Sequence, residues 1–240
     1  MVSTKIPLSR IAWIFLAYYS FKLLLIATCV ITLDNFYSVS VESYARILGY
    51  VGLIGEIPAA LIVWLLVKHY YNAGLQADGR GNFGLTRVTG RQMLLSILCG
   101  VTLALLAVVI SVMVPSGMTA THSSISLYLS HGTLMFLLWI STSVIVAPFV
   151  EELLFRGVIF STMVSNFNVF AGAVSSVFFF VLVHVPQLFG YWPPLMSIAL
   201  LGTFLVIVRV KMRSLWSSII VHISYNVLIA VLSIARFWMK

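Results

Sequence analysis

Residues 144–160 read VIVAPFVEELLFRGVIF. This stretch contains two adjacent glutamates, Glu151 and Glu152, inside a long apolar run typical of a membrane helix. The whole chain has 6 acidic residues, and two of them stand here. An ionisable side chain at the centre of a bilayer costs about 2.5–3.5 kcal/mol on insertion scales. Such groups are retained where they face a wet cavity or a partner, so this pair is the first candidate for a functional site.

The composition around this pair is that of a membrane protein. The chain has 240 residues, of which 61% are hydrophobic and 8% charged, and its mean hydropathy is +1.10. A soluble domain carries about 25% charged residues. The apolar stretches are long and continuous, whereas a transmembrane β-barrel requires alternation. We therefore predict an all-α, polytopic transmembrane helical bundle of about eight helices, forming a single membrane domain over residues 1–240.

A membrane span needs roughly 20 apolar residues, and this length divides the chain into expected helices. They lie near residues 11–33, 45–67, 93–114, 127–147, 148–164, 169–185, 195–208 and 215–236. Pro148 is expected to break the fourth helix or to start the next one. The first apolar run is too long for the core of a cleavable signal peptide and is expected to be a true span.

The net charge of +8 comes from basic residues at helix ends and in short loops, which indicates membrane lipid rather than nucleic acid as the partner. The positive-inside rule places the N-terminus, the loop at 68–91 and the connector at 209–213 on the cytoplasmic side. These three agree only if an even number of crossings separates them, which predicts that the helix with the two glutamates does not span fully. Cys29 and Cys99 lie in apolar runs and indicate buried thiols without a disulfide framework.

The C-terminal third holds a small set of intramembrane polar residues that can be sorted by helical spacing. They are Glu151, Glu152, Arg156, His184, His222 and Asn226. Residues four apart share a helix face, so Glu152 and Arg156 are expected to form a charge-neutral brace. Glu151 then points elsewhere without a local counter-charge. A carboxylate and an imidazole can activate a water, and a second imidazole with a carboxamide can donate to an oxyanion.

Two charged residues lie outside this set, in the first two helices. Lys22 is in the middle of the first helix and is expected to snorkel or to pair. Glu56 lies well inside the second helix and either faces a cavity or meets Lys22 on the neighbouring helix. We do not expect a catalytic role for Glu56.

The spacing of the polar residues resembles that of the CAAX-protease and bacteriocin-processing (CPBP) family of intramembrane proteases. The segment 151–156, EELLFR, is similar to the family motif EExxxR. The segments 180–184, FVLVH, and 222–226, HISYN, are similar to its FxxxH and HxxxN motifs. The three motifs occur in the family's order across residues 147–226, whereas the N-terminal half resembles the family only as generic spans.

The resemblance implies an intramembrane endopeptidase that cuts a membrane-associated peptide, a leader-type peptide or a prenylated protein near the membrane surface. By the resemblance, Glu151 and His184 would activate the water, while His222 and Asn226 would bind the oxyanion. Glu152 and Arg156 would shape the site. We expect no cofactor and favour a glutamate-type hydrolase.

Zinc remains the alternative cofactor, since Glu151, His184 and His222 could ligate the ion with a water at the fourth position. The HExxH spacing is absent from the sequence, which favours the metal-free mechanism.

Two other functions remain open. A non-catalytic bacteriocin-immunity or scaffold protein of the same fold would keep the helices and bind a peptide or an enzyme. A transporter would use the same buried ionisable groups as a proton relay, although these residues cluster in one half and no internal repeat is visible. In every case we expect a multi-pass integral protein of a cell membrane.

Overall fold

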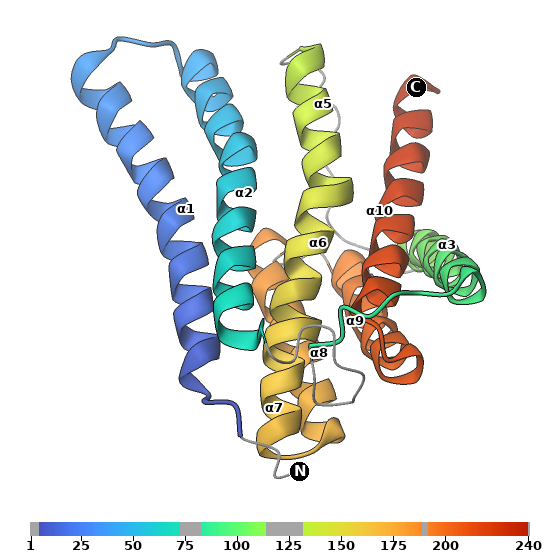
Figure 1. Ribbon diagram of the computed structural model, residues 1–240. Coiled ribbons are helices and arrows are strands. Elements are labelled where there is room, and N and C mark those ends of the chain that lie inside the picture. The colour runs from blue at the N-terminus through green and yellow to red at the C-terminus, as the bar shows by residue number, and fades with distance from the viewer. Residues whose placement is uncertain (1–4, 73–82, 114–131, 189–191, 240) are drawn as a thin grey trace.

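The computed structural model describes residues 5–72, 83–113, 132–188 and 192–239. These residues form helices and no strand, which confirms the expected all-α bundle. The helices, labelled as in Figure 1, are α1 (Ser9–Phe36), α2 (Val41–Tyr71), α3 (Gly90–Met113), α5 (Thr133–Ser141), η2 (Thr142–Val146), α6 (Ala147–Glu152), η3 (Leu153–Ile159), α7 (Phe160–Asn166), α8 (Val169–Leu188), α9 (Trp192–Met212) and α10 (Leu215–Trp238).

The helices from α5 to α7 are one continuous helical segment, Thr133–Asn166, in which η2 and η3 are π-helical. The two helices expected at 127–147 and 148–164 are therefore joined, and Pro148 does not interrupt the helix. Pro148 stands in the first turn of α6, and Ala147 just before it keeps helical dihedral angles. Membrane helices tolerate proline when local π adjustments re-satisfy the backbone.

Seven helices of the described chain are long and apolar enough to cross a membrane, and the protein is a multi-pass integral membrane protein. The continuous segment Thr133–Asn166 counts as one of the seven, with 34 residues. Among the described residues, four of these helices lie between the end of α2 and the basic end of α9, an even number that agrees with the positive-inside placement. Whether the segment with the two glutamates spans fully stays a prediction.

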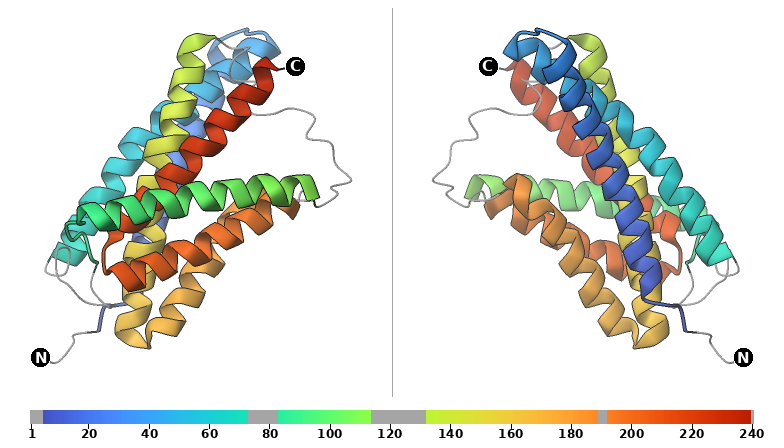
Figure 2. Two further views of the ribbon diagram at one scale, coloured as in Figure 1. Left: turned by 90° about the vertical axis from the view of Figure 1, so that its right-hand side faces the viewer. Right: turned by 90° about the vertical axis from the view of Figure 1, so that its left-hand side faces the viewer.

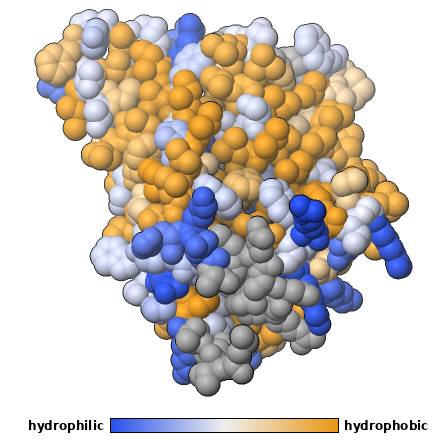
Figure 3. Space-filling view, viewed as in Figure 1, coloured by the Kyte–Doolittle hydropathy of each residue, from blue (hydrophilic) through white to orange (hydrophobic). Residues whose placement is uncertain are grey.

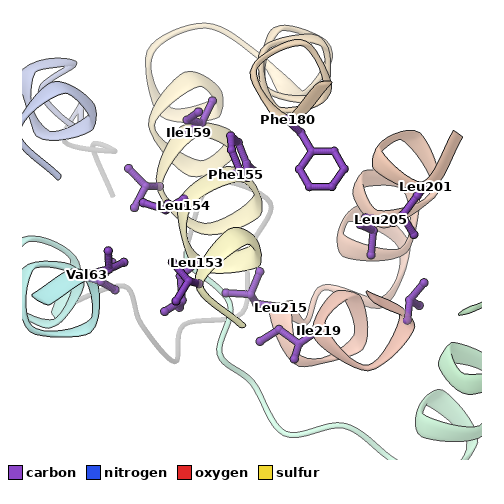
Figure 4. Packing of buried hydrophobic residues seen from close by; sticks show 14 of the residues in the cluster. Val63, Leu153, Leu154, Phe155, Ile159, Phe180, Leu201, Leu205, Leu215 and Ile219 are labelled. Atoms are coloured by element: carbon purple, nitrogen blue, oxygen red, sulfur yellow. The ribbon is translucent and has the colours of Figure 1, made fainter. Parts of the chain in front are cut away.

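The continuous segment stands at the centre of the fold, with α1 and α2 on one side and α3 and α10 on the other (Figure 1). In Figure 2, α3, α8 and α9 are inclined to the steeper helices α1, α2 and α10. The core runs along the central segment, where Leu153, Phe155 and Ile159 pack with Phe180 and Leu205 (Figure 4). The upper part of the face in Figure 3 is broadly hydrophobic, as a lipid-facing surface requires, and hydrophilic residues gather in its lower part.

Candidate active site

The buried ion pair at the centre of the site joins Glu152 to Arg156, as the spacing of four residues predicts. Arg156 Nη1 donates to Glu152 Oε1 over 2.9 Å, and both side chains are fully buried. Arg156 Nη2 also donates to the carbonyl oxygen of Gly202 in α9, over 3.1 Å. Among the described residues, Glu152 Oε2 and Arg156 Nε have no hydrogen-bond partner. The pair therefore ties α9 to the central segment at a high desolvation cost.

Phe180 of α8 connects this ion pair to the two histidines. The guanidinium carbon of Arg156 lies 4.2 Å from the centre of the Phe180 ring, a cation–π distance. The same ring lies 4.9 Å from the His184 imidazole and 5.8 Å from the His222 imidazole, both edge-on. The aromatic residue of the FxxxH motif thus contacts the cation and both imidazoles.

His222 of α10 faces both glutamates. Its Nδ1 lies 3.0 Å from Glu152 Oε1, and its Nε2 lies 3.7 Å from Glu151 Oε2. An ionised carboxylate only accepts hydrogen bonds, so Nδ1 of His222 carries a proton and donates it to Glu152. The hydrogen bond fixes the tautomer of the ring and turns Nε2 towards Glu151, as a carboxylate does for a histidine in many catalytic sites.

One ring nitrogen of His184 of α8 is held by its own helix. Its Nδ1 lies 2.7 Å from the carbonyl oxygen of Phe180, four residues earlier on the same helix. A carbonyl only accepts, so Nδ1 donates this hydrogen bond, and in the neutral form of the ring the lone pair is on Nε2. His184 is partly buried rather than enclosed. Such a nitrogen is suited to accept a proton from a water.

Asn226 is held by a backbone carbonyl that Pro148 leaves without its helical partner. In η2 the N–H of Ala147 donates to the carbonyl of Thr142, five residues back. In this register the carbonyl of Ser143 would pair with residue 148, which is proline and has no N–H. Asn226 Nδ2 donates to Ser143 O instead, over 2.8 Å. The amide nitrogen carries two hydrogens, so one N–H is still available to a substrate oxygen.

The position of α10, and so of His222, depends on its close packing against α3 at Gly100. A Cβ atom at Gly100 would lie under 3.0 Å from the carbonyl oxygen of Val221 and from the side chain of Ser224. The backbone atom cannot move as a side chain could. Glycine at this position therefore allows the contact that places His222 beside the central segment.

A short stretch before α3 links two of the helices that carry site residues. Phe83 is buried, and its ring lies against Gly157 of η3, where a Cβ atom would come within 2.7 Å of Phe83 Cε2. The next residue, Gly84, has φ of +73° and accepts a hydrogen bond from the N–H of Leu215, over 2.6 Å. This stretch joins η3, which follows the glutamates, to the first residue of α10, which carries His222.

The described side chains do not assemble the zinc site that the sequence allowed. No group of three or more His, Cys, Asp or Glu side chains in residues 5–72, 83–113, 132–188 and 192–239 is arranged to hold a metal ion. Glu151, His184 and His222 do not form such a group, and the mechanism proposed below uses no metal.

The sequence did not reveal several contacts of the site. The bridging of both glutamates by His222, and the carbonyl groups of Ser143 and Gly202 as acceptors, depend on helix crossings that have no local signal. Lys22 and Glu56 do pair across α1 and α2, one of the alternatives expected for them. The hydroxyl of Tyr18 joins that pair, and no motif indicates it.

The comparison with protein families agrees with this geometry. Residues 133–228 match the family model described as type II CAAX prenyl endopeptidase Rce1-like. We call these residues, which are similar to that family, the Rce1-like region. The match confirms the resemblance to the CAAX-protease family and supports an intramembrane CAAX-type endopeptidase as the general class of activity. The Rce1-like region begins with α5 and ends within α10, so it contains all six candidate residues. No curated protein and no solved structure matched the chain.

Proposed function

We propose that the protein is an endopeptidase that hydrolyses a peptide bond of a membrane-associated substrate, a prenylated or leader-type peptide, through a water activated by Glu151 and His184. The observation that carries the proposal is the pair of side chains Glu151 and His222, whose Oε2 and Nε2 atoms lie 3.7 Å apart. An oxygen atom can lie within about 2.8 Å of both, since 3.7 Å is less than twice that hydrogen-bond length. The lipid-facing surface and the Rce1-like match support a substrate that reaches the site from the membrane.

The proposed reaction begins with a proton transfer from water to the carboxylate of Glu151, assisted by the Nε2 lone pair of His184. The hydroxide adds to the carbonyl carbon of the peptide bond, and the carbonyl oxygen becomes an oxyanion. In this proposal the His222 ring is doubly protonated at this step, so its Nε2–H and the second N–H of Asn226 donate to this oxygen. The proton then passes to the leaving nitrogen, the C–N bond breaks, and a carboxylic acid and an amine are formed.

In this proposal Glu152 and Arg156 are positioning residues. Glu152 holds the Nδ1 proton of His222, so that Nε2 is the nitrogen that faces Glu151 and the substrate. Arg156 balances the charge of Glu152 and fixes it to α9. Removal of a single oxyanion donor costs about 10²–10³ in kcat in other hydrolases, and we expect similar losses for His222→Ala.

The test compares wild-type protein with Glu151→Gln, using Glu42→Gln as the matched control because Glu42 is an exposed carboxylate in the first turn of α2. Membranes from cells that make each protein at equal levels are examined by mass spectrometry for new peptide ends, and each purified protein is incubated with a synthetic farnesylated CAAX peptide. We expect cleavage by wild type and Glu42→Gln, and none by Glu151→Gln.

A fully active Glu151→Gln protein would overturn the proposal. Identical peptide ends in all three membranes, with all proteins folded and the farnesylated peptide intact, would favour the non-catalytic immunity or scaffold function.

A further inference from the structure

The first two helices, which lie outside the Rce1-like region, hold a second ion pair that is partly buried. The ammonium of Lys22 in α1 pairs with Oε1 of Glu56 in α2, and the hydroxyl of Tyr18 donates to Glu56 Oε2 over 3.0 Å. The Lys22 nitrogen also lies 5.2 Å from the centre of the Tyr18 ring. Because Tyr18 and Lys22 are four residues apart, they share one face of α1, and Glu56 holds both.

This group lies on the face of α1 that packs against the central segment. Tyr18 and Lys22 are three and seven residues after Phe15, so the three side chains share that face of α1. Phe15 of α1 packs edge-on against Phe155 of η3, with ring centres 5.8 Å apart, so α1 lies against the helix that carries the glutamates.

The positive charge of Lys22 matters for the site because it can pair with a carboxylate. An ammonium inside a bilayer must find a counter-charge, and its flexible stem allows it to search a radius of several ångströms. Glu56 supplies that counter-charge and makes the pair neutral. Glu152 is already engaged by Arg156 and His222, whereas the one ion pair of Glu151 among the described residues is the contact with the His222 imidazole.

We infer that Glu56 is a positioning residue that keeps Lys22 away from Glu151, so that Glu151 faces His222 and can act as the base. The inference rests on the proposed function in one respect, the role of Glu151. Without Glu56, the Lys22 ammonium pairs with Glu151. A carboxylate paired in this way is a weaker base and is turned away from His222 and the water.

This role predicts an asymmetry that a structural ion pair does not. Lys22→Met and Glu56→Gln each break the same contact. A brace that only holds α1 to α2 would make both variants lose activity to a similar degree. If Glu56 acts by restraining Lys22, Lys22→Met keeps activity because no cation is left to capture Glu151, whereas Glu56→Gln loses it.

The first experiment measures kcat and KM on the farnesylated CAAX peptide for wild type, Lys22→Met, Glu56→Gln and the double variant. A general base contributes about 10²–10⁴-fold, so we expect kcat to fall at least about tenfold in Glu56→Gln with KM little changed. We expect Lys22→Met to stay within about threefold of wild type, and the double variant to recover to that level, since coupled residues give non-additive effects. Equal losses in the two single variants, or no recovery in the double variant, would overturn the inference.

The second experiment needs no activity. A membrane-soluble carbodiimide activates a carboxyl group, and a contacting amine then displaces the urea to leave an amide. Peptide mass spectrometry should find Lys22 joined to Glu56 in wild type and Lys22 joined to Glu151 in Glu56→Gln. Absence of the Lys22–Glu151 amide in Glu56→Gln would overturn the inference. An inactive wild-type protein with the expected amides would count against the proposed function alone.

Discussion

Replacement of Arg156 by methionine is expected to lower the free energy of unfolding by about 3–5 kcal/mol, since it leaves a buried carboxylate without its cation. Methionine approximates the length of the arginine stem, so the variant removes the charge and the hydrogen bonds rather than the packing volume. Both side chains of the Glu152–Arg156 pair are fully buried, and water cannot replace the lost cation.

The contacts of Arg156 lead to a similar magnitude. The hydrogen bond to Glu152 is charge-assisted and contributes about 1.5–3 kcal/mol, and the bond to the carbonyl of Gly202 involves the same charged donor. The contact with the Phe180 ring adds up to about 2 kcal/mol in a desolvated site. The free-energy contributions of these contacts cannot simply be added, because the contacts share one side chain. Their combined contribution is therefore close to the cost of breaking a buried pair.

The measurement is equilibrium unfolding in mixed micelles of dodecyl maltoside and SDS, followed by tryptophan fluorescence. The matched control is Arg46→Met, which breaks the exposed pair between Arg46 and Glu42 and should cost about 0–1 kcal/mol. The double variant Glu152→Gln with Arg156→Met should be more stable than Arg156→Met alone, because no charge is left unpaired. A loss below about 1 kcal/mol in Arg156→Met, or no recovery in the double variant, would refute the reasoning.

Three further outcomes are expected. Gly100→Ala should destabilise the protein by about 1–3 kcal/mol and abolish cleavage, since its Cβ would meet the carbonyl of Val221. The control Gly52→Ala, whose Cβ meets no atom within 4 Å, should do neither. Equal behaviour of the two variants would contradict the close approach of α3 and α10. Asn226→Ala should cost about 1–3 kcal/mol by leaving the carbonyl of Ser143 unpaired, and Asn226→Gln should not restore stability, both measured by the same unfolding assay. Dialysis against a strong chelator, with metal content checked by mass spectrometry, should leave peptide cleavage unchanged, and loss restored by zinc alone would instead support the metal mechanism.

The local part of the site could be predicted from the sequence because it depends on helical spacing alone. Glu152 and Arg156 are four residues apart and pair as predicted. Phe180 and His184 are four residues apart on one helix, and their rings do meet. Pairing of Lys22 with Glu56 was one expected alternative, because two intramembrane charges of opposite sign on neighbouring helices have few other partners.

The remaining part depends on how the helices cross and on a backbone irregularity. Nothing in the sequence near His222 indicates that its two ring nitrogens face two adjacent glutamates. The contact of Asn226 with Ser143 requires the π register of η2. The expected break at Pro148 did not occur for the same reason, because the π register and the Asn226 side chain accommodate the missing N–H.

The stretch with Phe83 and Gly84 has a practical consequence for anyone who wishes to label or divide this protein. It looks like the end of an ordinary loop, and loops are the usual choice for an inserted tag or a chain break. Yet Phe83 lies against Gly157 and Gly84 bonds to Leu215, so the two halves of the site are fastened together there. A reporter inserted beside Phe83 would separate them, whereas one placed after Tyr37, between α1 and α2, would leave them undisturbed.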